Sequence, residues 1–176
     1  MDKQEEKVLV LCQRRSGKGD ELDELNKSID ALVKDILGVD NATIQYVNRP
    51  GFFPGKADLE HEFGDNEETK QLATDYSLII CNTCPLPYMN YNIINRHLRM
   101  GGFLALTVYQ NYNLAAKEIQ DNITKKGVLP QILKAGFNYY EINFKKDALV
   151  FRKEYSGGKR TTKRKNRRSK TKHFRK

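Results

Sequence analysis

The residues best suited to chemistry lie in two short polar segments, each of which follows an apolar run. The first segment, residues 12–19, reads CQRRSGKG. Arg14, Arg15 and Lys18 stand just before a predicted helix, where free backbone N–H groups and the helix dipole favour an anion. The segment therefore predicts an anion site for a phosphate or a nucleic-acid backbone. A solvated basic loop explains the same residues equally well.

The end of this segment also looks like part of the phosphate-binding loop of nucleotide hydrolases. Such a loop reads G-x-x-x-x-G-K-[ST], and its last hydroxyl holds magnesium. Here Cys12 stands at the position of the leading glycine and Gly19 at that of the hydroxyl. Because both departures affect groups that the reaction needs, the sequence argues against nucleotide hydrolysis.

The second polar segment, residues 82–88, reads NTCPLPY and follows the apolar run YSLIIC. Open α/β sheets bind ligands at the carboxyl ends of their strands, so this segment is the best candidate for a binding pocket. Asn82 and Tyr88 are its candidates for contact with a substrate. The stronger interpretation is a structural loop that ends a strand and caps a helix.

Cys81 and Cys84 form a C-x-x-C pattern, which can indicate a redox pair or a zinc site. A zinc site needs four ligands, and only Cys12 and His97 are expected nearby. The chain has three cysteines, an odd number, and an acidic N-terminus unlike that of a secretory signal. We therefore expect no metal site, and reduced thiols that pack as small apolar side chains in an intracellular compartment.

Most of the excess positive charge lies at the C-terminus. Residues 156–176 hold 11 of the 31 Lys and Arg residues and no acid, which leaves 20 bases against 22 acids in residues 1–155. A segment so poor in apolar residues is predicted to be disordered, and its cations should bind nucleic acid without sequence preference. An acidic protein or an acidic membrane surface is the alternative polyanion. The cations of the tail are Lys159, Arg160, Lys163, Arg164, Lys165, Arg167, Arg168, Lys170, Lys172, Arg175 and Lys176.

Hydrophobic patterning predicts one α/β domain over residues 1–155. Four apolar runs predict a mostly parallel sheet, and two more predict an antiparallel hairpin at its edge. Leu and Ile at helical spacing predict helices over 20–37, from Leu86 to about Met100, and twice within 114–134, while Gly101 and Gly102 are predicted to form a turn. No apolar run is long enough to span a membrane. The predicted strands are 7–12, 43–48, 76–81, 103–109, 138–144 and 148–152.

Residues 49–75 differ from the rest of the domain. They carry an acidic run and few apolar residues, so a long loop is predicted, with a short helix near 67–73. No third parallel strand is evident in this span, which indicates that one strand of the sheet is missing.

The order YSLIICN … HLRMGGFLALTVY, followed by LPQILKAGFNYYEINFKKDALVFRKEY, resembles the second half of class I S-adenosylmethionine-dependent methyltransferases. The resemblance covers residues 76–155 well and residues 7–48 loosely. It implies a Rossmann-like three-layer sandwich.

The resemblance also implies a cofactor site for S-adenosylmethionine. In this family a glycine loop after the first strand approaches the cofactor, and an acid at the end of the second strand holds its ribose. Ser16, Gly17 and Gly19 would lie in that loop and Asn48 at the ribose. The chain departs from the pattern at both places, since arginines stand where small residues belong and Asn48 stands where the family has a carboxylate.

Amino-methyltransferases carry Asn/Asp-Pro-Pro-Tyr/Phe after their fourth strand, where the polar groups accept hydrogen bonds from the target amine and the ring stacks on the base. Asn82, Pro85 and Tyr88 have the right residue types at a different spacing. The resemblance therefore implies Asn82 and Tyr88 as catalytic residues if the domain is active.

Two hypotheses follow. The first is a nucleic-acid-associated protein in which a degenerate methyltransferase-like domain binds no cofactor and residues 156–176 bind the polyanion. The second is an active S-adenosylmethionine-dependent methyltransferase acting on nucleic acid. The runs VLVLCQRRSGK, LIICNTCP and GGKR also resemble proteins of large nucleocytoplasmic DNA viruses, which implies a virion, viral-factory or nuclear location.

Overall fold

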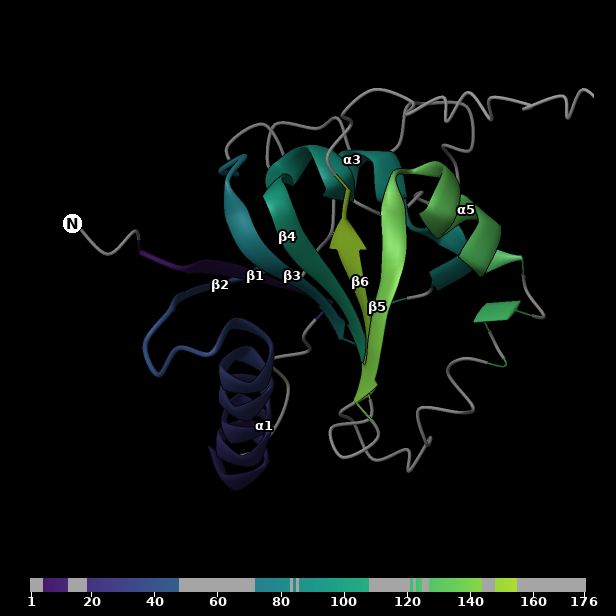
Figure 1. Cartoon of the computed structure of the whole chain (residues 1–176). Coiled ribbons are helices and arrows are strands. Elements are labelled where there is room, and N and C mark those ends of the chain that lie inside the picture. Colours follow the sequence, from purple (N-terminus) through teal and green to yellow (C-terminus); the bar gives the residue numbers. More distant parts are fainter. Residues whose placement is uncertain are drawn as a thin grey trace, which may run out of the picture.

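A six-stranded mixed sheet forms the centre of the fold (Figure 1). The computed structural model describes residues 5–12, 19–47, 72–82, 84, 86–107, 121, 123–124, 127–143 and 148–154, without the side chains of 21–22, 88 and 141–143. The strands are β1 (Lys7–Leu11), β2 (Thr43–Val47), β3 (Tyr76–Asn82), β4 (Leu98–Thr107), β5 (Phe137–Asn143) and β6 (Ala148–Lys153).

The strand order is β2-β1-β3-β4-β6-β5. The first four strands in this order pair in parallel, and β6 runs antiparallel between β4 and β5. Every residue of β3 is buried, as a continuously apolar central strand requires. The predicted parallel sheet with a C-terminal antiparallel hairpin is therefore confirmed.

Helices cover both faces of the sheet, which confirms the predicted α/β three-layer sandwich (Figure 1). On one face α1 (Gly19–Leu37) packs Ile29 and Leu32 against Val10 and Ile80 of the sheet. On the other face lie α3 (Tyr91–His97) and α5 (Val128–Lys134), packed on the alternate residues of the same strands.

The helix predicted from Leu86 to about Met100 is wrong at both ends, since α3 ends at His97 and residues 98–100 belong to β4. A single 3₁₀ turn, η1 (Leu86–Tyr88), comes first, and α3 begins only at Tyr91. Asn90 is the reason, because its Oδ1 accepts a hydrogen bond from the Ile93 amide at 3.2 Å and so caps the helix.

The predicted Gly-Gly turn before the fourth strand is also wrong. Gly101 and Gly102 lie inside β4, which begins at Leu98 directly after α3. The register against β3 shifts here, so that Tyr76 faces Leu98 while Leu78 faces Phe103. This bulge brings Gly102 so close to its neighbours that a Cβ there would lie 3.0 Å from the Arg99 carbonyl oxygen.

Several predicted features lie outside the described residues. They include most of the 49–75 loop, the first helix of 114–134 and the tail 156–176. Within the described part, β2 is the last strand on its side of the sheet, with no third parallel strand beside it. None of the described helices has the length and apolar character needed to cross a membrane.

Candidate functional site

The site that the topology favours lies where β1 and β3 end. From β1 the chain continues to β2 on one side, and from β3 it continues to β4 on the other. Ligands of open α/β sheets bind at such a switch point, outside the carboxyl ends of the strands. Leu11 pairs with Cys81 in register, so the segments after the two strands lie next to each other.

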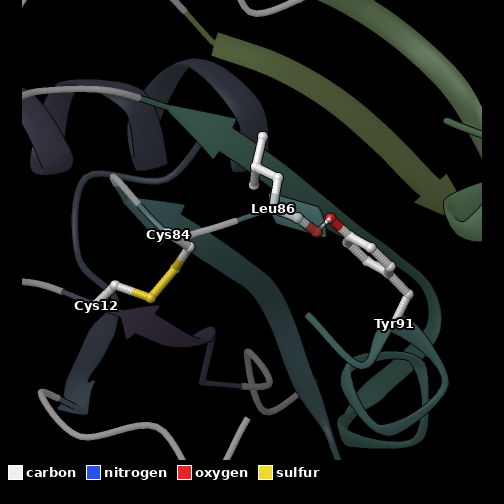
Figure 2. The surroundings of a disulfide bond; sticks show 4 residues. All are labelled: Cys12, Cys84, Leu86 and Tyr91. Atoms are coloured by element: carbon white, nitrogen blue, oxygen red, sulfur yellow. Dashed lines mark hydrogen bonds between the residues drawn. A yellow bond between two sulfur atoms is a disulfide. The ribbon is translucent and has the colours of Figure 1, made fainter. Parts of the chain in front are cut away.

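A disulfide bond between Cys12 and Cys84 joins these two segments (Figure 2). The two Cα atoms are 5.5 Å apart, although 72 residues separate the cysteines in sequence. The expectation of three reduced thiols is therefore wrong. The bond lies across the switch point and ties the predicted cofactor loop to the segment that follows Asn82.

The backbone of Cys12 has a strained conformation but adds a hydrogen bond at the same place. Its φ of 66° is in the left-handed region, which a residue with a side chain adopts at a cost of roughly 1 kcal/mol. Its amide donates a hydrogen bond to the Val47 carbonyl oxygen at 3.1 Å. The ends of β1 and β2 and the segment after β3 are thus held together by one residue.

The segment after β3 is anchored on its other side by α3 (Figure 2). The Tyr91 hydroxyl donates a hydrogen bond to the Leu86 carbonyl oxygen at 2.8 Å. Tyr91 is buried, and that burial raises the pKa of its hydroxyl. Cys84 is itself only 8% exposed, so the disulfide is part of the core that α3 covers.

The two cysteines of the C-x-x-C pattern, Cys81 and Cys84, are not bonded to each other. Cys81 is a free thiol that is fully buried inside β3, while Cys84 is bonded to Cys12. Burial raises the pKa of the Cys81 thiol, so it stays neutral and unreactive near pH 7. Cys81 thus packs as a small apolar side chain, as predicted, and its partner in the pattern does not.

No cluster of metal-ligating side chains occurs among the described residues. His97, the histidine considered for such a site, is the last residue of α3. Its Nδ1 is 2.7 Å from the Ala73 carbonyl oxygen, so the ring links the helix to the segment before β3. This contact gives His97 a structural role.

Asn82 lies at the carboxyl end of β3, as predicted, and pairs in register with Thr107 at the end of β4. Asn82 is fully buried and Thr107 is 3% exposed. The Thr107 Oγ1 atom has no hydrogen-bond partner among the described residues. Two polar side chains therefore lie together at the strand ends, but neither is open to solvent.

The other predicted site residues fall in three groups. Gly19 is the first residue of α1, exposed, with open space where a Cβ would lie. Tyr88 belongs to η1, and its side chain is outside the described part. The tail cations are likewise outside it, and the assignments there stay predictions, as do those of Arg14, Arg15, Ser16, Gly17, Lys18 and Asn48.

Sequence reasoning missed Cys12 as a site residue, although a signal for it existed. Cys12 is the last residue of the first predicted strand, and Cys84 follows the third, and both strands were predicted to belong to the parallel part of the sheet. Carboxyl ends of adjacent parallel strands meet at one edge, so adjacency of these two strands would have brought the thiols within bonding reach.

No family model and no curated protein matches this chain. Among solved structures it is similar to the CMeT domain of the citrinin polyketide synthase, at 15% identity over 84% of this chain and 46% of the other, with a TM-score of 0.37. It is also similar to the Methanococcus jannaschii fibrillarin pre-rRNA processing protein, at 13% identity over 89% and 69% of the two chains, with a TM-score of 0.44. A fibrillarin in complex with Nop5p shares 13% identity over 85% and 72%, with a TM-score of 0.39.

The chain spans about half the length of the polyketide synthase domain. All three TM-scores are below 0.5, so these similarities carry no argument about activity. The fold follows from the sheet itself. The usual doubly wound order is 3-2-1-4-5-6. The described sheet follows this order without the outer third strand, so that β3 and β4 occupy the positions of the fourth and fifth strands of the usual fold. β6 lies between β4 and β5. The chain has an α/β Rossmann-like fold.

Proposed function

We propose that this protein is a nucleic-acid-associated protein whose methyltransferase-like domain no longer binds its cofactor. The observation that carries this proposal is the Cys12–Cys84 disulfide at the switch point. A cofactor in this fold needs the backbone after β1 to approach it closely. Here Cys12, the first residue after β1, is bonded through its side chain to Cys84 in the segment after β3. The two sulfur atoms lie between the ends of β1 and β3 (Figure 2).

The polar groups at the same edge support the proposal. Asn82, the residue that would hold a target amine, is fully buried at the end of β3. A buried amide cannot meet a substrate unless the segment after β3 moves, and the bond to Cys12 and the hydrogen bond from Tyr91 restrain that segment. The domain then serves as a rigid support.

The tail supplies the nucleic-acid association in this proposal. Eleven cations without an acid lie in residues 156–176, whereas residues 1–155 have a net charge of −2. Each Lys or Arg that meets a phosphate releases a counterion, so binding should be strong at low salt and indifferent to sequence. An acidic protein is the alternative partner for the same charge.

Ligand titration tests whether the domain binds the cofactor. S-adenosylmethionine and S-adenosylhomocysteine are titrated calorimetrically into the full chain, freed of nucleic acid at high salt, in its oxidised and reduced forms. We expect no binding to the oxidised form up to millimolar ligand. Micromolar binding by the oxidised form would contradict the proposal, and binding only after reduction would favour the second candidate below.

Deletion of residues 156–176 tests the tail. The logarithm of the association constant for a DNA duplex is measured against the logarithm of the salt concentration, with and without the tail. We expect the deletion to remove most of the slope, which is about 0.9 per phosphate contact for duplex DNA. An unchanged slope would place nucleic-acid binding elsewhere or exclude it.

A second candidate function is an active S-adenosylmethionine-dependent methyltransferase acting on nucleic acid. The observation that favours it is the pair Asn82 and Thr107, since the Thr107 Oγ1 atom is buried without a partner among the described residues. A ligand group could satisfy that hydroxyl once the disulfide is reduced. Transfer of a labelled methyl group by the reduced protein, abolished by Asn82→Ala, would establish this activity.

The same proposal extends to location. Of the settings that the sequence implies, a virion agrees best with the Cys12–Cys84 bond, because disulfides persist in oxidising surroundings such as particle surfaces. The redox state of Cys12 in protein isolated without reductant, trapped by alkylation, tests this assignment.

A further inference from the structure

A group of two aromatic rings and one arginine lies toward the opposite end of the sheet from the disulfide. Tyr140 and Arg152 are exposed, and Phe103 is half-buried against the core on the α1 face. Phe103 of β4 and Arg152 of β6 pair in register near the amino ends of the parallel strands. Tyr140 of β5 joins them, with its ring centroid 5.0 Å from that of Phe103. We call Phe103, Tyr140 and Arg152 the ring patch.

The ring patch is held rigidly by its own contacts. Phe103 and Tyr140 meet edge to face, with an interplanar angle of 63°. The Arg152 guanidinium lies 5.6 Å from the centroid of the Phe103 ring, and its Nε donates a hydrogen bond to the Gly101 carbonyl oxygen at 3.3 Å. A ligand that meets these groups would therefore find them already in place.

The patch is nevertheless open to solvent. Tyr140 is 53% exposed, the largest exposed fraction among the large apolar side chains that the structure describes. Arg152 is exposed as well, and no carboxylate of the described part forms an ion pair with it. The packing of the core does not require an exposed tyrosine ring beside an exposed guanidinium.

Single-stranded nucleic acid is the ligand class that fits this chemistry. Bases stack on exposed aromatic rings whatever their sequence, and an arginine adds a contact to phosphate or to the base face. A duplex hides its base faces, so it can use the arginine but not the ring. The patch thus predicts a preference for single strands over duplexes.

The position of the patch favours a nucleic acid over a protein partner. Arg152 precedes Ser156, the first residue of the basic tail, by four residues. Lys159 follows Arg152 by seven positions, a distance of at most roughly 25 Å when the chain is extended. A strand bound by the tail is therefore held close to the patch, and the second contact becomes intramolecular.

We propose that Phe103, Tyr140 and Arg152 form a stacking site for single-stranded nucleic acid. This site adds base contacts to the phosphate contacts of the tail, and it rests on the proposed function. The tail provides affinity without preference, and the patch provides the preference for unpaired bases.

The test uses Tyr140→Ala in the full chain, with Tyr139→Ala as its matched control. The two tyrosines are neighbours on β5, and Tyr139 is 42% exposed but packs on the other face, 5.2 Å from the Phe151 ring. Binding of a fluorescent oligothymidylate and of a duplex of equal length is followed by anisotropy. We expect Tyr140→Ala to weaken single-strand binding about tenfold. Duplex binding should not change, and neither ligand should respond to Tyr139→Ala.

Tyr140→Phe separates the ring from the hydroxyl and guards against a loss of folding. It should keep the single-strand affinity of the unmodified chain, because stacking needs only the ring. Equal single-strand affinity of Tyr140→Ala and the unmodified chain would overturn the stacking site while leaving the tail-driven binding intact. If the unmodified chain binds neither ligand, the proposed function itself fails.

A second copy of this chain is the competing occupant, since β5 lies at the edge of the sheet. Sedimentation of the unmodified chain and of Tyr140→Ala distinguishes this case. A dimer that Tyr140→Ala dissociates, with unchanged single-strand affinity, would assign the patch to self-association and overturn the proposal. A monomer in both cases supports it.

Discussion

β1 and β3 are linked at both of their ends, but by different interactions. At the carboxyl ends, a covalent bond links Cys12 to Cys84 in the buried core. At the amino ends, the Lys7 ammonium meets the Asp75 carboxylate at 2.9 Å, with both side chains nearly half exposed. The carboxyl ends, which the disulfide closes, are the ends where an open α/β sheet binds ligands. We call them the closed end. Here Cys84 belongs to the buried core at that end, and Cys12 packs against it.

The ring patch lies toward the other end of the sheet. Phe103 and Arg152 pair near the amino ends of the parallel strands, and β6 ends on the same side, at Lys153. Buried groups therefore stabilise the domain at the carboxyl ends of the strands, whereas Tyr140 and Arg152 on the other side are exposed to solvent.

The largest effect should come from removing the disulfide. Cys12→Ser, or reduction of the unmodified chain, should lower the free energy of unfolding by about 4 kcal/mol, the entropy of closing a loop of this length in the unfolded chain. Urea unfolding of both forms measures it. Reduction of Cys12→Ser should add nothing further. A stability that does not change on reduction would mean that the closed end is closed by packing alone.

The closed end should also make the protein sensitive to alkali. Burial raises the pKa of the Cys81 thiol and of the Tyr91 hydroxyl, so both stay protonated in the folded chain where an unfolded chain would lose the proton. The contribution of these two groups to stability is therefore constant below about pH 8.5, the pKa of a free thiol, and falls above it.

The slope identifies the groups. Each should contribute at most about 1.4 kcal/mol per pH unit, beginning near pH 8.5 for Cys81 and near pH 10 for Tyr91. Urea unfolding from pH 7 to pH 11 measures this. Cys81→Ala should flatten the first part of the curve and Tyr91→Phe the second. A decline that neither change affects would assign the alkaline transition to other groups.

The sequence predicted the parts of this molecule that depend on local pattern. Continuous apolar runs placed β1 and β3 within one residue of their observed ends, because strands buried in the middle of a sheet are apolar throughout. β-Branched and aromatic residues did the same for β2, which is only partly buried. The disulfide could not be predicted in the same way. It depends on which strands are neighbours and on the Leu11–Cys81 register, and neither is a local property.

The error at Gly101 and Gly102 has a similar origin. Two glycines after a helical pattern indicate a turn when only local propensity is considered. In the fold they permit a bulge in β4, where Gly102 lies against the backbone of β3 at Ser77. The need for a close approach of two strands comes from tertiary packing, which a single sequence does not reveal.

Gly102→Ala should have an intermediate effect. A Cβ at this position would lie 3.0 Å from the Arg99 carbonyl oxygen and 3.2 Å from that of Ser77, and backbone atoms cannot yield as a side chain can. We expect a loss of roughly 1–3 kcal/mol, as for overpacking elsewhere. Thermal and urea unfolding measure it. Gly19→Ala is the matched control, because nothing lies within 4 Å of a Cβ there. Equal stability of the two variants would show that the bulge can relax.

The smallest effect should come from the amino ends of the same strand pair that the disulfide joins. Lys7→Gln and Asp75→Asn each remove the ion pair between the Lys7 ammonium and the Asp75 carboxylate. The ion pair raises the pKa of Lys7, but the group is exposed, and water and salt screen such a pair. We therefore expect urea midpoints that agree with the unmodified chain within error, at both low and high salt. A clear loss at low salt that disappears at high salt would mean that this end is also held electrostatically. The two ends of the β1–β3 pair would then differ in the kind of link that joins them rather than in whether they are held.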